Sequence, residues 1–299
     1  LPIFKIIIEP ENTGAKAIQV PFNVTIPLHE LKKIATDVIH AIENVNLNNC
    51  RNFSNLKNIC YLQFYNQIFP DYSIREILEK SDNKFIYFKL SENLLALPFE
   101  ALYDGTGFLS LDYPIAKQLI KDYKSHQTVK SQTNCDNQDI KDILLLFNPD
   151  SNEKFRSVID KERSALKKSL SQFAYDEFEG INIKINDLEN SLWCYKLIYY
   201  SGHSTPSELI LDEGKLESEK LKVFKFDNCE LIYLNSCSSL QKADTSEKPS
   251  IIRALLENET TKSNFNVLGN ITRVENEKAS AMAQTIFKKL LKGKNIGLA

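Results

Sequence analysis

The stretch Ile143-Leu144-Leu145-Leu146-Phe147, followed by Asn148-Pro149-Asp150, decides the fold class. Five consecutive apolar residues leave no polar face for solvent, which is typical of a parallel-sheet strand covered on both sides. Asn-Pro-Asp interrupts the run, and helical spacing then extends from Phe155 to Phe173. A strand followed directly by a helix indicates a unit of an α/β fold.

The same alternation continues toward the C-terminal end. Strands separated by helices imply right-handed crossovers and neighbouring parallel strands. We therefore predict an α/β fold with a largely parallel sheet flanked by helices. The remaining strands are expected at Ile181–Ile185, Lys196–Tyr200, Leu231–Asn235 and Phe265–Leu268, with helices at Asp187–Cys194, Ser250–Glu257 and Glu275–Leu291.

A second mixed α/β region precedes this one. Its strands are expected at Ile3–Ile8, Ala17–Ile26 (pairing with the first) and Lys84–Leu90, and its helices at Leu28–Ile42, Leu56–Ile68 and Ser73–Leu78. Between the regions, Lys124–Asp139 is polar and nearly free of large apolar residues, as expected of a linker. We therefore divide the chain into residues 1–130 and 131–299.

Composition excludes several classes of protein. With 42% hydrophobic and 25% charged residues, the 299-residue chain is typical of a globular protein. A net charge of −2 argues against direct nucleic-acid binding, which needs a concentrated basic field. No apolar run approaches the ~20 residues that cross a bilayer, so no membrane partner is expected. The start at Leu1 without methionine suggests a fragment or a processed chain.

The six cysteines and four histidines show no metal-ligand spacing, so we expect neither a metal nor a cofactor. A chain of this size without a dense cysteine framework favours free thiols in a reducing compartment. We predict a cytoplasmic protein.

Two expected strands end in small polar residues around one reactive side chain. The first reads LIYYSGHS from Leu197 to Ser204, and the second reads LIYLNSCSS from Leu231 to Ser239. If these strands are neighbours, their backbones lie about 4.8 Å apart. His203 and Cys237 would then face one substrate carbonyl, although a buried thiol and a structural histidine would explain the same spacing.

The pair suits nucleophilic catalysis. Cys237 would attack a peptide carbonyl, activated by His203, which would then protonate the departing amine. The backbone N–H groups of Ser204 and Cys237 are candidate oxyanion donors. Gly202 would let the chain turn tightly beside the histidine.

The run from Leu197 to Cys237 resembles the CHAT family of caspase-like cysteine peptidases, whose motifs are Gly-His-Gly and a later Ser/Asn-x-Cys-x-Ser. Leu97–Asp104 (LPFEALYD) resembles the family's Leu-Pro-aromatic-Glu-x-Leu signature, and the patchy similarity covers Leu56–Leu298. The chain departs from the family at Ser204, which replaces a glycine, and at Thr272–Asn276, where members often carry Trp-Pro-Val-Asp-Asp.

The resemblance implies a caspase-like catalytic lobe preceded by an N-terminal pseudo-caspase lobe, in which Asp104, Pro98 and Glu100 hold structure. Candidate cleft residues are Tyr200, Ser236 and Arg273. Strand packing, a turn and an exposed surface position are the respective alternatives.

The resemblance further implies a cysteine endopeptidase that cleaves a protein partner and uses no cofactor. An upstream sensor or regulatory protein in a bacterial defence system, CRISPR-associated or similar, would activate it, with the polar loop Gln241–Pro249 as the gate. Two alternatives are a catalytically inactive interaction module and a small-molecule enzyme with Cys237 as acyl nucleophile. Substitution of the motif glycine by Ser204 favours the inactive module.

Overall fold

A computed structural model describes residues 3–8, 18–23, 27–45, 50–69, 74–79, 86–90, 94–95, 97–119, 141–148, 153–237, 239, 249–262, 265–270, 272 and 274–292. The chain forms two compact units, Leu1–Ser125 and His126–Gly297, and each is described by itself. The predicted linker and its boundary at residue 130 lie outside the described residues.

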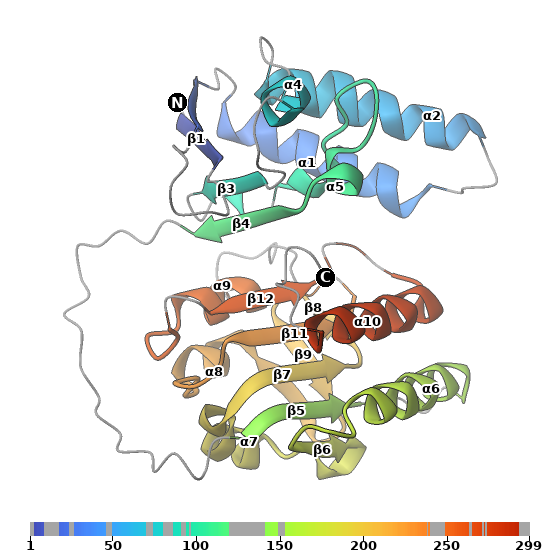
Figure 1. Ribbon diagram of the computed structural model, residues 1–299, viewed down its shortest axis with the longest axis vertical. Coiled ribbons are helices and arrows are strands. Elements are labelled where there is room, and N and C mark those ends of the chain that lie inside the picture. The colour runs from blue at the N-terminus through green and yellow to red at the C-terminus, as the bar shows by residue number, and fades with distance from the viewer. Residues whose placement is uncertain are drawn as a thin grey trace. The chain divides into compact units, whose positions relative to one another are not determined.

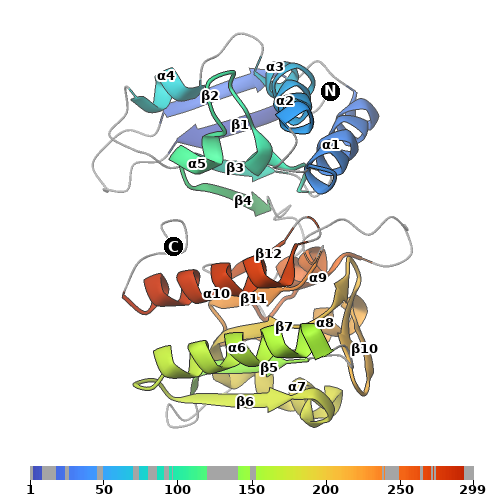
Figure 2. The same ribbon diagram turned by 90° about the vertical axis from the view of Figure 1, so that its right-hand side faces the viewer.

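The N-terminal unit contains a four-stranded mixed sheet in the order β2-β1-β3-β4 (Figure 2). β1 pairs antiparallel with both β2 and β3, and β3 pairs parallel with β4, so the predicted pairing of the first two strands is confirmed. The description of this unit as a pseudo-caspase lobe stays a prediction. The strands are β1 (Ile3–Ile8), β2 (Ile18–Asn23), β3 (Ile86–Leu90) and β4 (Ile115–Leu119).

Helices of the N-terminal unit pack on this sheet through an aromatic core. Phe88 of β3 stacks on Phe99 with ring centroids 4.1 Å apart, and Phe64 packs against Phe99. All three rings are fully buried. The helices are α1 (Leu28–Glu43), α2 (Cys50–Asn58), a π-helix (Ile59–Tyr65), α3 (Asn66–Ile68), α4 (Ile74–Glu79), a 3-10 turn (Phe99–Ala101) and α5 (Leu109–Asp112).

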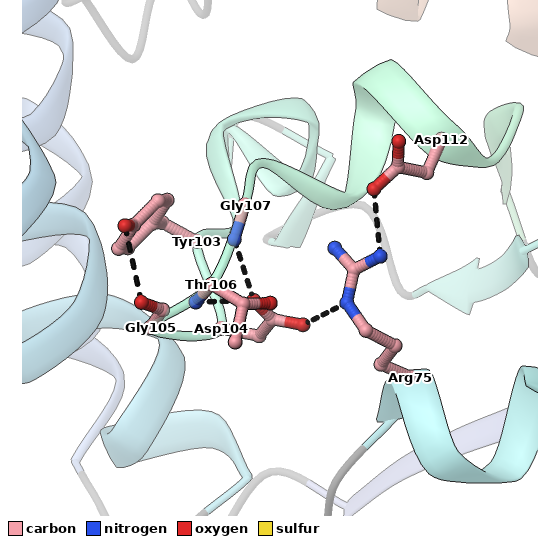
Figure 3. Close-up of polar contacts among 7 residues, drawn as sticks. All are labelled: Arg75, Tyr103, Asp104, Gly105, Thr106, Gly107 and Asp112. Atoms are coloured by element: carbon pink, nitrogen blue, oxygen red, sulfur yellow. Dashed lines mark hydrogen bonds and ion pairs between the residues drawn. The ribbon is translucent and has the colours of Figure 1, made fainter.

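Asp104 closes a turn in this unit (Figure 3). Its Oδ1 accepts hydrogen bonds from Thr106 N, Thr106 Oγ1 and Gly107 N at 2.7–2.9 Å. Its Oδ2 accepts one from Arg75 Nε at 2.6 Å, while Arg75 Nη1 binds Asp112 at 2.7 Å. Burial alone would raise the pKa of Asp104, but these hydrogen bonds lower it overall. Asp104 therefore fixes a loop and lies in the N-terminal unit, whereas the dyad candidates belong to the other unit.

The C-terminal unit is built on a five-stranded sheet in the order β12-β11-β7-β5-β6 (Figure 1). Every neighbouring pair is parallel. The predicted α/β fold with a parallel sheet flanked by helices is confirmed for this unit. The strands are β5 (Lys141–Phe147), β6 (Tyr175–Glu179), β7 (Tyr195–Ser201), β11 (Leu231–Asn235) and β12 (Asn266–Gly269).

Successive side chains of β7 enter different cores because strand residues alternate between the faces of a sheet. Tyr199 packs with α6 and α10, which lie side by side across one face (Figure 2). Tyr200 packs with α7, α8 and α9 on the other face. The helical segments of this unit are α6 (Glu153–Ser169), a 3-10 turn (Gly180–Asn182), α7 (Ile185–Ser191), a 3-10 turn (Leu192–Cys194), α8 (Ser218–Val223), α9 (Ile251–Glu257) and α10 (Asn276–Leu290).

The predicted strand at Ile181–Ile185 is wrong. The strand is β6, a charged segment (YDEFE) that precedes Gly180, whose φ of +54° turns the chain into a 3-10 turn. α6 makes a charged edge strand possible here, because Arg163 and Lys167 both pair with Glu177 of β6.

A three-stranded antiparallel sheet, which the sequence pattern did not predict, follows β7. It consists of β8 (Ser204–Thr205), β9 (Glu208–Leu211) and β10 (Gly214–Glu217) in the order β10-β9-β8. β8 starts directly after His203, so its pairing with β9 fixes the path of the backbone beyond the histidine. Among the described residues, no helix is long and apolar enough to cross a bilayer.

Candidate active site

His203 and Cys237 follow the carboxyl ends of adjacent parallel strands. In the register of β7 and β11, Ser201 lies opposite Asn235. His203 is two residues beyond Ser201, and Cys237 is two residues beyond Asn235. Because parallel strands end at the same edge, both reactive side chains lie at the edge where open α/β sheets place their sites.

The two side chains line one cleft with about 340 Å³ of space, including the part open to solvent. α6 and the first turn of α10, with Val274 just before it, form its walls, and the ends of β7 and β11 form its base. The lining residues are Phe155, Val158, Ile159, Glu162, Ser201, Gly202, His203, Asn235, Ser236, Cys237, Val274, Asn276 and Ala279.

The histidine is held through both its ring and its backbone. The imidazole stacks on Phe155 of α6, with ring centroids 4.3 Å apart and planes inclined by 26°. The His203 carbonyl accepts a hydrogen bond from Ile210 N of β9 at 2.9 Å. The Tyr200 hydroxyl also lies 2.8 Å from this carbonyl oxygen. The β8–β9 pairing and Tyr200 therefore support the loop that presents the imidazole.

Tyr200, predicted as a possible cleft residue, does not line this cleft. Only 1% of it is exposed, and strand alternation directs it to the opposite face of the sheet from α6. Burial raises the pKa of the Tyr200 hydroxyl far above its ordinary value, so the group stays protonated, and its single proton lies between the carbonyl oxygens of His203 and Ile210, at 2.8 and 2.6 Å. Its position is that of a support beneath the His203 loop.

Gly202 allows the Tyr200 side chain to lie close against the backbone at position 202. A Cβ at Gly202 would lie 2.5 Å from the Tyr200 hydroxyl oxygen and 3.1 Å from Cβ of Asn148. Any larger residue would therefore displace Tyr200 or the end of β5. The glycine is needed for space and not for a left-handed backbone.

The loop carrying Cys237 is bound to the residue after the histidine. The Ser204 hydroxyl lies 2.6 Å from the Cys237 carbonyl oxygen and 2.9 Å from the hydroxyl oxygen of Ser236, which is buried. Asn270 Nδ2 donates to the Ser236 carbonyl at 3.1 Å. The Cys237 thiol donates to the Val274 carbonyl at 3.8 Å. Ser236 thus lines the cleft, while its contact with substrate and the oxyanion roles of Ser204 and Cys237 stay predictions.

Glu162 of α6 is a cleft residue that the sequence analysis missed. Its side chain is buried, its Oε1 accepts from the Tyr199 hydroxyl at 2.7 Å, and its Oε2 accepts from Asn235 Nδ2 at 3.1 Å. Burial raises its pKa, and these hydrogen bonds oppose the rise. A sequence signal existed, because Glu162 stands at helical spacing from Val158 and Ile159, within an otherwise apolar stripe.

The remaining candidate residues either lie outside the described part of the chain or are chemically unsuited to catalysis. Arg273 and the predicted gate, apart from Pro249, lie outside the described residues. Burial raises the pKa of the Cys60 and Cys229 thiols to about 12, so both are unreactive at neutral pH. In the part of the chain that the structure describes, no three His, Cys, Asp or Glu side chains gather as metal ligands.

Comparison with known proteins gives a family match over most of the chain. A model of the CHAT domain matches residues 62–299. A search of the curated proteins found no match.

Three solved structures are similar to about half of this chain. The Arg-specific cysteine proteinase gingipain R has 10% identity and a TM-score of 0.37, with 53% of this chain and 38% of that chain covered. The complex of RgpB pro- and mature domains from Porphyromonas gingivalis has 10% identity and a TM-score of 0.36, with 52% and 38% covered. A flavodoxin of Streptococcus pneumonia TIGR4 has 10% identity and a TM-score of 0.30, with 51% and 99% covered. The match therefore spans well under half of the gingipain chains.

Proposed function

The chain belongs to the CHAT family of caspase-like proteins, and on this premise we propose that it is a cysteine endopeptidase that acts through His203 and Cys237. The observation that carries the proposal is the position of the two residues. They follow neighbouring parallel strands at equal distance from the paired residues Ser201 and Asn235, and they line one cleft. A thiol and an imidazole at one strand edge are the two groups that peptide-bond cleavage through an acyl-enzyme needs.

The chemical steps follow from these two groups. The Cys237 thiol gives its proton to His203 as the sulfur forms a C–S bond to the peptide carbonyl carbon. The C–N bond then breaks, and His203 gives the proton to the departing amine. Water attacks the resulting thioester, which releases the carboxylic acid and returns the proton to sulfur. Before attack, the thiol must turn away from the Val274 carbonyl, its hydrogen-bond acceptor in the free protein.

The developing oxyanion would be held by the backbone N–H groups of Ser204 and Cys237. Each such donor is worth roughly 3 kcal/mol of transition-state stabilisation in other enzymes. The contact of the Ser204 hydroxyl with the Cys237 carbonyl links the two segments that carry these donors. Ser204, although it replaces the family's glycine, would in this way help to hold the nucleophile loop.

The substrate we propose is a protein partner, cleaved after activation by a regulatory or sensor module in a bacterial defence system. Membership of the CHAT family and the four cysteines that the described residues show as free thiols support an intracellular, cytoplasmic setting. The loop Gln241–Pro249 would act as the gate because it follows the nucleophile. Deletion of this loop should make cleavage independent of the activator.

A thiol-directed peptidyl probe tests the proposal without knowledge of the substrate. An acyloxymethyl ketone probe should label Cys237 in the wild-type chain, as located by peptide mass spectrometry. Labelling should fall to background in His203→Ala and stay unchanged in Cys194→Ala, which removes a different partly buried thiol.

Probe labelling distinguishes the first alternative, and a turnover assay with peptide, ester and thioester substrates distinguishes the second. An inactive interaction module would show equally slow labelling of Cys237 with and without His203. Its supporting observation is the contact of the thiol with the Val274 carbonyl. A small-molecule acyl-transfer enzyme would turn over thioesters or esters but cleave no peptide bond.

A further inference from the structure

One residue interrupts the apolar stripe that α6 packs against the sheet. Phe155, Val158, Ile159 and Leu166 are buried at helical spacing, and Glu162 lies among them with 2% of its surface exposed. Burying a carboxylate away from water costs several kcal/mol unless hydrogen bonds replace its hydration. A glutamate at this position is therefore unfavourable for folding and needs a compensating role.

The Glu162 carboxylate makes a full set of hydrogen bonds. In addition to the Tyr199 hydroxyl and the Asn235 amide, it binds the hydroxyl groups of Ser201 and Ser280. A carboxylate has about four acceptor sites, and four neutral donors fill them. Neutral donors therefore compensate the buried carboxylate without a positively charged partner among them.

Three of the four donors come from the two strands that precede the catalytic pair, and Ser280 comes from α10. Tyr199 and Ser201 belong to β7, which ends two residues before His203, and Asn235 ends β11, two residues before Cys237. The Asn235 Nδ2 also lies 2.9 Å from the Tyr199 hydroxyl oxygen. Glu162, Tyr199 and Asn235 are therefore each hydrogen-bonded to the other two. One side chain of α6 thus binds both strand ends.

We propose that Glu162 is a positioning residue that sets the distance between His203 and Cys237 by holding both strand ends to α6. This inference rests on the proposed function as a cysteine peptidase. Glu162 touches neither substrate nor the reacting atoms in this role. It acts through Ser201 and Asn235, so its removal should slow chemistry more than it weakens binding.

The test compares Glu162→Gln with a variant that reverses one hydrogen bond. The Glu162→Gln substitution keeps the shape of the side chain but replaces one acceptor oxygen with an N–H donor, so either Tyr199 or Asn235 loses its acceptor. The double variant Glu162→Gln/Asn235→Asp lets that N–H donate to a carboxylate and restores the bridge. Asp160→Asn removes an exposed carboxylate from the same helix and is the matched control.

Labelling kinetics with the peptidyl probe separate chemistry from binding. A misplacement near 1 Å can cost about 100-fold in rate. We expect the maximal inactivation rate of Glu162→Gln to fall by about 100-fold and its half-saturating probe concentration to change less than about threefold. The double variant should recover at least about tenfold, and Asp160→Asn should match wild type. If folded Glu162→Gln labels as fast as wild type, the inference is overturned.

Hydrogen exchange separates this inference from the proposed function. Exchange of backbone amides at residues 201–203 and 235–237 should rise at least about tenfold in Glu162→Gln. If wild type labels no faster than His203→Ala while this exchange rises, the peptidase proposal fails and the anchoring stands. Unchanged exchange refutes the anchoring. Should Glu162→Gln not fold, Tyr199→Phe removes one of the four donors, and an unchanged labelling rate would overturn the inference.

Discussion

Removal of the Ser204 hydroxyl should both destabilise the C-terminal unit and slow Cys237. A hydroxyl has one proton, so Ser204 donates to the Cys237 carbonyl at 2.6 Å and accepts from Ser236 at 2.9 Å. Ser204→Ala loses both bonds. At about 1 kcal/mol net for each hydrogen bond, the unfolding free energy should fall by about 2 kcal/mol. For a unit of this size, that corresponds to a decrease in Tm of about 4–8 °C.

Thermal unfolding followed by circular dichroism measures the stability effect, and probe labelling measures the effect on Cys237. The matched control is Ser169→Ala, whose exposed hydroxyl binds only a carbonyl of its own helix and should change Tm little. Labelling of Ser204→Ala should be at least about tenfold slower than that of wild type. A Tm within about 1 °C of wild type together with undiminished labelling would refute the tethering role.

Three further changes test other parts of the account. Tyr200→Phe should cost about 1–3 kcal/mol of unfolding free energy in chemical denaturation, because it removes the one hydroxyl proton that the carbonyls of His203 and Ile210 share; a loss below about 0.5 kcal/mol would contradict this support. Burial raises the pKa of Glu162 above its ordinary 4.5, so the folded state binds the proton more tightly than the unfolded chain. Its contribution to stability is therefore complete below pH 4.5 and is lost as pH rises through the folded-state pKa, by at most about 1.4 kcal/mol per pH unit. The difference in unfolding free energy between wild type and Glu162→Gln should fall with pH in this window, and a flat difference would contradict the shift. Asp104→Ala should destabilise the N-terminal unit by about 1.5–3 kcal/mol, because it removes a charge-assisted hydrogen bond from Arg75, which keeps Asp112 as a partner; hydrogen exchange of that unit should accelerate, and exchange at wild-type rates would refute the structural role.

The sequence predicted the strands that carry the candidate site because burial on both faces leaves a strong signal. β5, β7 and β11 are continuous apolar runs, and their polar ends mark where each leaves the sheet. Residues at equal offsets beyond parallel strands must lie at one edge, so His203 and Cys237 could be placed together once the strands were neighbours.

What the sequence did not predict depends on tertiary contacts. β6 is charged and becomes a strand because α6 supplies Arg163 as a partner. Tyr199 and Tyr200 have the same chemistry, and only the order of the layers decides which of them faces α6. Glu162 was overlooked because a single acidic residue in an apolar stripe is normally assigned to solvent, and its donors come from three elements (β7, β11 and α10) that are distant from it in the sequence.

The most direct test of the central claim is a proteomic comparison of new N-termini formed by the activated wild-type chain and by Cys237→Ala. The account predicts one or a few cleaved proteins that are present with wild type, absent with Cys237→Ala and present with Cys194→Ala. Identical sets of N-termini from wild type and Cys237→Ala would show that the thiol cuts no peptide bond and would contradict the account.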